Sequence, residues 1–84
     1  GDVWTLGIHK LFVVSVIDEW SQWGPQLEGD ALFVPYPSPF AAVSVKGRER
    51  KLVMVQPDTY IAGHCIDRFK EQNPKTKVTC HRAK

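Results

Sequence analysis

Histidine and cysteine are the residue types in this chain best suited to proton transfer, metal binding or redox chemistry. The 84-residue chain contains three histidines and two cysteines. Two of the histidines stand directly beside the cysteines: His64 precedes Cys65, and His81 follows Cys80. These two pairs could form a metal site, a disulfide or an acid–base pair. Which of these is possible depends on the helices and strands that carry the four residues.

Metal binding by the two Cys/His pairs is disfavoured by geometry. One pair falls in a segment with helical spacing and the other in a segment with strand alternation. Neighbouring side chains diverge by about 100° on a helix and point to opposite faces of a strand, so all four cannot converge on one ion. Zinc sites also space paired ligands by two to four residues. We therefore expect no metal and no other cofactor.

Two alternatives stay open for the cysteines, both of which are expected to point toward the core. Cys65 and Cys80 are either two buried free thiols, since reduced cysteine behaves as a small hydrophobic residue, or a disulfide that joins a helix to the last strand. The disulfide would close a loop of about fifteen residues and stabilise the fold by roughly 3 kcal/mol in the chain-entropy model. The redox state of the compartment decides between them.

Two histidines near neutral pKa would suit metal-free cleavage of RNA, which needs a general base and a general acid. His64 on the polar face of a helix and His81 on the outward face of a strand form the candidate catalytic pair. Arg68 or Lys77 would stabilise the phosphorane. The alternative is that these histidines and His9 have no catalytic role. No phosphate loop, serine elbow or paired-carboxylate spacing supports other chemistry, and we expect a protein that is not an enzyme.

Positive charge is concentrated in the second half of the chain. Residues 46–84 contain ten Lys or Arg against four Asp or Glu, whereas residues 1–45 contain one against five. The net charge of +2 therefore hides one segment of +6 and another of −4. Such asymmetry indicates an anionic partner for the basic half.

The segment KGRERK, residues 46–51, is the most basic stretch and is expected to form the tip of a hairpin. Its four cations exceed what Glu49 can neutralise, so the tip can hold phosphate groups. The predicted nucleic-acid-binding residues are Lys46, Arg48, Arg50, Lys51, Lys75, Lys77 and Arg82. The alternative is a solvated turn whose charges protect the sheet from aggregation.

The large aromatic residues lie mainly in the acidic half. Trp20, Trp23 and Tyr36 are the predicted protein-contacting residues, because aromatic side chains beside acids suit a protein partner or a second copy of the chain. Packing inside the core is the alternative. Stacking on bases is disfavoured because these residues are not interleaved with Lys and Arg.

Hydrophobic spacing predicts the elements of the first half. Residues 11–17 (LFVVSVI) are rich in β-branched residues and indicate a buried strand, followed by a helical turn or loop over residues 18–23. The competing interpretation is one helix over residues 5–23. Residues 31–34 form a short strand. Residues 35–39 contain three prolines, which lack sheet donors, and therefore form a sheet edge or an extended connector.

The second half has clearer spacing. Residues 40–46 and 51–56 alternate as a hairpin pair around Gly47. Pro57 and Asp58 begin a helix that Asn73 and Pro74 end. Its apolar face consists of Ile61, Ala62, Cys65, Ile66 and Phe69. Residues 76–82 form a final strand, with Val78 and Cys80 on one face and Lys77, Thr79 and His81 on the other.

These elements predict a single small α+β domain over residues 1–84. A mostly antiparallel sheet of about four or five strands would carry one main C-terminal helix on one face, followed by a final strand. The predicted function is a non-catalytic module whose basic hairpin and C-terminal strand contact nucleic acid. The alternatives are a protein-interaction or inhibitor module, monomeric or dimeric, that docks on an acidic partner, and a small metal-independent ribonuclease.

The sequence gives no sign of a membrane location. No apolar run approaches the ~18 residues that a membrane-spanning helix needs. The sequence also lacks a positively charged start followed by an apolar core, the pattern that would indicate a signal peptide. We therefore expect no membrane contact. The compartment stays open, with a cytoplasmic location slightly favoured.

Overall fold

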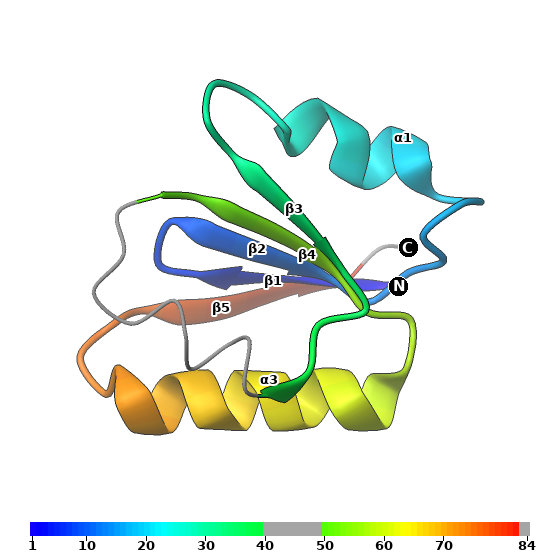
Figure 1. Cartoon of the computed structure of the whole chain (residues 1–84). Coiled ribbons are helices and arrows are strands. Elements are labelled where there is room, and N and C mark those ends of the chain that lie inside the picture. The colour runs from blue at the N-terminus through cyan, green and yellow to red at the C-terminus, as the bar shows by residue number, and fades with distance from the viewer. Residues whose placement is uncertain (40–49, 83–84) are drawn as a thin grey trace.

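A five-stranded sheet with helices on both faces forms the structure, a computed structural model that describes residues 1–39 and 50–82 (Figure 1). The elements are, in chain order, β1 (Asp2–Leu6), β2 (His9–Phe12), α1 (Trp20–Trp23), the 3-10 helix η1 (Gly24–Gln26), β3 (Leu32–Pro35), β4 (Leu52–Val55), α3 (Thr59–Gln72) and β5 (Val78–Arg82). The α+β class and the order of helix and final strand are as predicted. Among the described residues, no helix has the length and apolar character to cross a membrane.

The sheet is mixed, which corrects the prediction that it is mostly antiparallel. Its strand order is β3-β4-β2-β1-β5. β4 pairs in parallel with both β2 and β3, whereas β1 pairs antiparallel with β2 and β5. Parallel neighbours need a long connection between them, and the chain supplies one between β2 and β4, which contains β3, and another between β3 and β4.

The predicted hairpin between residues 40–46 and 51–56 is only partly open to test. The second segment forms β4, whereas residues 40–49 lie outside the described residues. β4 pairs with β2 along one edge and with β3 along the other, so no edge of β4 is left for the predicted hairpin partner, and that part of the prediction is wrong. The hairpin that the structure does show joins β1 to β2 through a turn at Gly7 and Ile8, with Gly7 at a φ of 64°. Short hairpin turns of this kind favour residues that tolerate positive φ.

The strand interpretation of residues 11–17 is confirmed in part, and the helix over residues 5–23 is wrong. β2 begins earlier than predicted, at His9, and ends at Phe12. The predicted helical turn after the strand is present as α1. β3 confirms the strand at residues 31–34, and it lies at an edge of the sheet, where Pro35 costs no ladder hydrogen bond.

The helix α3 forms as its sequence predicts. The carboxylate of Asp58 accepts hydrogen bonds from the backbone amides of Tyr60 (2.9 Å) and Ile61 (3.1 Å), which caps the first turn. Its buried residues are Ala62, Cys65, Ile66 and Phe69. α3 runs from the end of β4 to the start of β5 and covers one face of the sheet (Figure 1).

Two apolar cores lie on opposite faces of the sheet. The larger core, between the sheet and α3, consists of Leu6, Leu11, Leu52, Met54, Ala62, Cys65, Ile66 and Phe69. The smaller core on the other face consists of Phe12, Val14, Val53 and Val55, with Trp23 and Phe33 packed against it. Successive residues of β4 enter alternate cores, so all four are buried. This two-sided burial explains its unbroken apolar sequence.

Gln56 is a polar residue inside the fold, with only 4 % of its surface exposed. Its side-chain amide donates to the carbonyl of Pro37 (3.0 Å), and its side-chain carbonyl accepts from the amide of Asp58 (3.2 Å). Its own backbone amide donates to the carbonyl of Phe12 (2.9 Å). One side chain therefore ties the loop after β3 to the start of α3.

Replacing Gln56 with leucine should destabilise the protein markedly. The Gln56→Leu variant would leave a buried carbonyl and a helix-terminal amide without this partner, at a cost of about 2–3 kcal/mol in the free energy of unfolding. Urea unfolding followed by circular dichroism measures this. Gln72→Leu, in the last turn of α3, is the matched control and should change the midpoint little. Equal midpoints for both variants would contradict a structural role of Gln56.

Candidate functional site

Four of the predicted nucleic-acid-binding residues lie at the same end of the sheet. β2, β4 and β5 run in the same direction, so their starting ends lie at the same end of the sheet. Arg50 and Lys51 directly precede β4, and Lys75 and Lys77 precede β5. Two basic segments that are 24 or more residues apart in the sequence therefore lie at the same end of the sheet, before β4 and β5, with β2 and β1 between those strands.

Two further lysines lie near these residues. Lys10 is the second residue of β2, and Lys70 lies in the last turn of α3, which ends where β5 begins. We call this group the basic end; it consists of Lys10, Arg50, Lys51, Lys70, Lys75 and Lys77. Three carboxylates lie at the same end of the fold, those of Glu28, Asp30 and Glu71. Lysine and arginine are therefore in excess there.

Several side chains of the basic end are held in place by neighbours. Arg50 donates from Nε to the backbone carbonyl of Asp30, and Lys51 donates from Nζ to Gln26 Oε1 (2.9 Å). The Lys70 ammonium lies 5.7 Å from the centroid of the Trp4 ring, a cation–π contact. These contacts fix part of the charge relative to the sheet.

The remaining predicted nucleic-acid-binding residues do not join this group in the described structure. Lys46 and Arg48 lie outside the described residues. Arg82 is at the far end of β5, paired with Asp2 of β1. The start of the C-terminal strand therefore lies at the basic end, whereas its last residue does not.

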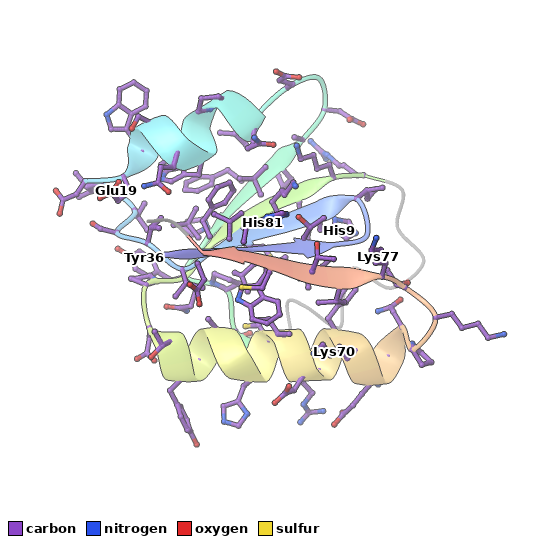
Figure 2. The ribbon with its side chains drawn as sticks, turned by 180° about the vertical axis from the view of Figure 1, so that it is seen from behind. His9, Glu19, Tyr36, Lys70, Lys77 and His81 are labelled. Carbon is purple, nitrogen blue, oxygen red and sulfur yellow. The ribbon has the colours of Figure 1, made fainter. Side chains whose placement is uncertain are left out.

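A hollow of ≈ 390 Å³ extends from the basic end across the face of the sheet opposite α3. It is lined by Thr5, Gly7, Lys77, Thr79 and His81. As predicted, the last three alternate along one face of the final strand; Lys77 and His81 are labelled in Figure 2. We call these five lining residues the hydroxyl cradle.

The structure does not bring His64 and His81 together. His64 is exposed on α3 and contacts the ring of Tyr60, with ring centroids 4.5 Å apart. His81 lies on the other face of the sheet, in the hydroxyl cradle. With α3 and the sheet between them, the two imidazoles do not line one cleft.

The third histidine has a structural position. His9 is buried, with 4 % of its surface exposed, and its Nδ1 accepts a hydrogen bond from the amide of Leu52 (3.0 Å). Its ring also meets the Phe69 ring edge-on, at 6.1 Å between centroids. Burial lowers the pKa of His9, because the charged imidazolium loses its hydration. A neutral His9 thus links β2 to β4.

The two cysteines differ in environment. Cys65 is buried on α3, where its Sγ donates to the carbonyl of Pro37 (3.6 Å), and burial raises the pKa of its thiol. Cys80 is exposed, which corrects the expectation that both point into the core. The reason is that β5 is an edge strand: Val78 packs against the larger core, but Cys80 lies further along the strand. Both are free thiols in this structure.

No metal centre is evident in the part of the chain that the structure describes, where no three His, Cys, Asp or Glu side chains are grouped to hold an ion. The aromatic residues predicted to contact a protein are divided. Trp20 and Tyr36 are exposed, at 64 % and 61 %. Trp23 instead stacks on Phe33, with ring centroids 4.4 Å apart, and donates from its indole to the carbonyl of Val16 (2.9 Å).

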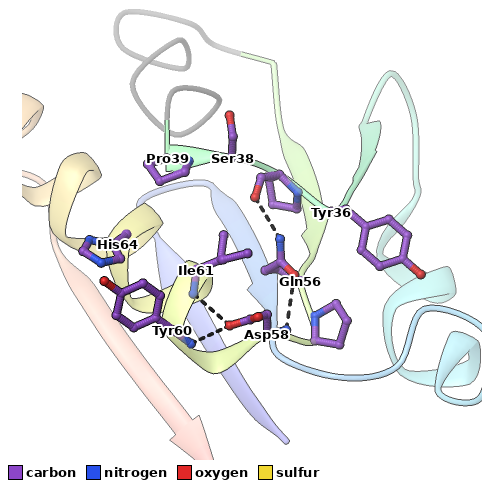
Figure 3. Close-up of a pocket in the computed structure, with 10 residues that line it drawn as sticks. Tyr36, Ser38, Pro39, Gln56, Asp58, Tyr60, Ile61 and His64 are labelled. Carbon is purple, nitrogen blue, oxygen red and sulfur yellow. Dashed lines mark hydrogen bonds between the residues drawn. The ribbon is translucent and has the colours of Figure 1, made fainter.

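A larger pocket of ≈ 610 Å³, which the sequence did not reveal, lies at the opposite end of the sheet from the basic end (Figure 3). It is lined by Tyr36, Pro37, Ser38, Pro39, Gln56, Pro57, Asp58, Tyr60, Ile61 and His64. β3 and β4 end beside it, as expected of pockets at the carboxyl ends of parallel strands. Only the parallel pairing, which local spacing does not encode, could have indicated it.

The backbone beside this pocket is held in an uncommon conformation. Tyr36 has a φ of 51°, in the left-handed region that a bulky residue rarely adopts, and its amide donates to the carbonyl of Val55 (2.8 Å). Asp58 already caps α3. Two tyrosines, three prolines and Ile61 make up most of the lining, which suits an apolar group better than a phosphate.

Stability should fall on mild acidification because of His9. Its lowered pKa means that, below pH of about 6.5, the unfolded chain binds more protons than the folded protein, so the free energy of unfolding decreases as pH falls and levels off below the folded pKa. Urea unfolding at pH 7.5, 6.5 and 5.5 measures this. His9→Gln retains an acceptor for Leu52 but does not titrate, and its profile should be flatter. Identical profiles would refute this account of His9.

The two thiols should react at very different rates. Iodoacetamide should modify Cys80 quickly in the native protein and Cys65 only after unfolding, because the thiolate is the nucleophile and the buried thiol is both shielded and harder to ionise. Mass spectrometry counts one adduct before urea and two after it. Native Cys80→Ser should remain unmodified. No adduct in non-reducing urea would instead indicate the disulfide, and rapid modification of Cys65 would contradict its burial.

Comparison of this chain with protein-family models, with curated proteins and with solved structures finds no match. Its function therefore has to be argued from the chemistry of its own surface.

Proposed function

We propose that this protein is a non-catalytic module that binds nucleic acid through the basic end. The observation that carries this proposal is the location of Arg50 and Lys51, together with Lys75 and Lys77, at the same end of the sheet. Two separate basic segments at the same end of the sheet, three strand spacings of about 4.8 Å apart, can contact different phosphates of one strand.

The chemistry of the basic end indicates how it would bind. Five of its six residues are lysines, which meet phosphate as point charges and not through the rigid two-pronged contact of arginine. Phosphate contacts position a nucleic acid without reading its sequence. We therefore expect binding that tolerates sequence changes and weakens steeply as salt increases, because each contact releases condensed counterions.

The positions of the histidines support binding over catalysis. A metal-independent ribonuclease needs its general base and general acid within reach of one ribose and its phosphate. His64 and His81 lie on opposite sides of the sheet, and His9 is buried and bonded to the backbone. The described histidines thus supply no pair for that reaction.

A protein-interaction module is the second candidate, and the exposed apolar residues near α1 favour it. Ile17 and Trp20 are 79 % and 64 % exposed, beside the carboxylates of Asp18 and Glu19. Exposed tryptophan is typical of protein interfaces. In this alternative the basic end docks on an acidic protein, and the module has no affinity for nucleic acid.

Removing one charge from each basic segment should weaken nucleic-acid binding in a predictable way. Arg50→Gln plus Lys75→Gln should lower the slope of log affinity against log salt by about two units, since each lost phosphate contact removes about one. Fluorescence anisotropy with labelled single-stranded DNA and RNA over a range of NaCl concentrations measures the slope.

The control removes the same charge elsewhere. Arg68→Gln plus Arg82→Gln changes the outer side of α3 and the far end of β5, and it should leave the slope unchanged. An equal decrease in both double variants would mean that net charge alone, and not the basic end, governs binding. No binding by the unmodified protein at low salt would overturn the proposal and favour the protein partner.

A further inference from the structure

We propose that the hydroxyl cradle is a binding site for one phosphodiester group of a nucleic-acid backbone. This inference deepens the proposed function and rests on it for the identity of the ligand. It assigns a specific role to residues that charge alone would not identify, the two threonines Thr5 and Thr79.

The sheet register places the polar groups of the cradle side by side. Thr5 of β1 pairs directly with Lys10 of β2 and with Thr79 of β5. Directly paired residues in an antiparallel ladder present their side chains on the same face at close range. Lys77 and His81 lie two residues to either side of Thr79, on the same face. Three strands thus contribute to one polar surface.

The hydroxyl cradle remains exposed because the smaller core covers a different part of the sheet face opposite α3. Trp23 of α1 packs against the smaller core, whose Phe12, Val53 and Val55 belong to β2 and β4. Beyond that cover Thr5 and Thr79 are half-buried, while Lys77 and His81 are exposed along β5 (Figure 2). A strand of nucleic acid can therefore reach the threonine hydroxyls from solvent.

The hydrogen bonds leave donors facing the hollow. Lys10 donates from Nζ to Thr5 Oγ1 (2.8 Å), and a hydroxyl that accepts one bond can still donate its own proton. In the described part of the chain, no residue forms a hydrogen bond with the Thr79 hydroxyl. Both hydroxyls can therefore donate to the oxygens of one anion.

The charge of the cradle selects an anion. None of its five lining residues is acidic, Lys77 contributes one positive charge, and Lys10 contributes a second through its bond to Thr5. Hydroxyl donors combined with ammonium groups match the acceptor-only oxygens of a phosphodiester. The larger pocket offers the opposite chemistry, since the residues described in its lining include Asp58 and no lysine or arginine.

The hairpin turn closes one side of the cradle and requires glycine. Gly7 adopts a φ of 64°, and a Cβ at this position would come within 2.9 Å of Thr76 Cγ2. Its amide donates to the carbonyl of Lys77 (3.0 Å). The turn is thus fixed against the segment that carries Lys77, so the wall of the cradle is held by backbone contacts.

The first test removes one hydroxyl without changing charge or shape. Thr79→Val should lower the affinity for a labelled twelve-nucleotide single strand by about tenfold, the usual loss for a hydrogen bond to a charged group, with the salt slope unchanged. Thr59→Val, an exposed threonine in the first turn of α3, is the control and should bind as the unmodified protein does. Unchanged affinity of Thr79→Val, or an equal loss in both variants, would overturn the inference.

The second test uses the unmodified protein, so its result does not depend on whether a variant folds. Inorganic phosphate added to the ¹⁵N-labelled protein should shift the amide resonances of Thr5, Lys77, Thr79 and His81 in a saturable way, whereas NaCl at matched ionic strength should not. Equal shifts with both salts would overturn the inference.

The two tests separate failure of the cradle from failure of the proposed function. Saturable phosphate binding without affinity for the oligonucleotide would leave the cradle as a phosphate site, refute the phosphodiester assignment and refute the proposed function. Oligonucleotide binding that Thr79→Val leaves intact would refute the cradle and leave the basic end as the binding surface.

Discussion

Burial of β4 on both faces is the constraint on which the rest of this structure depends. Leu52 and Met54 enter the core under α3, while Val53 and Val55 enter the core under α1. The strand also pairs on both edges, in parallel with β2 and with β3. A strand in this position needs covering helices on both sides and long connections to its neighbours. The layers of the fold follow from that requirement.

Parallel pairing around β4 also separates the chemistry of the two ends of the sheet. The starts of β2, β4 and β5 gather lysine and arginine at one end, together with the end of α3. The ends of β3 and β4 gather prolines, tyrosines and the capped start of α3 at the other. The buried amide of Gln56 holds this second end together through hydrogen bonds to Pro37 and Asp58. One end therefore suits anions and the other suits apolar groups.

The elements that were predicted correctly are those whose signals are local. α3 has a capping aspartate, an apolar face at helical spacing and a terminating Asn-Pro, all within seventeen residues, 58–74. The alternation of Lys77, Thr79 and His81 on one face of the final strand was likewise visible in the sequence. The β1–β2 hairpin was missed because Gly7 and Ile8 lack the Asn-Gly or Asp-Gly signal of a tight turn. The exposure of Cys80 was missed because strand spacing does not indicate which strand lies at the edge.

Local structure and the distribution of charge follow from the amino-acid sequence alone: a capped helix, short apolar strands, proline at an edge and a basic second half. The three-dimensional fold was needed to show that the sheet is mixed, that Arg50 and Lys51 lie at the same end as Lys75 and Lys77, and that Thr5, Lys10 and Thr79 share one surface. It also decided that His64 and His81 are kept apart. The physical reason is that strand order and direction depend on contacts between residues tens of positions apart, and the periodicity of any one segment reports only which of its faces is buried.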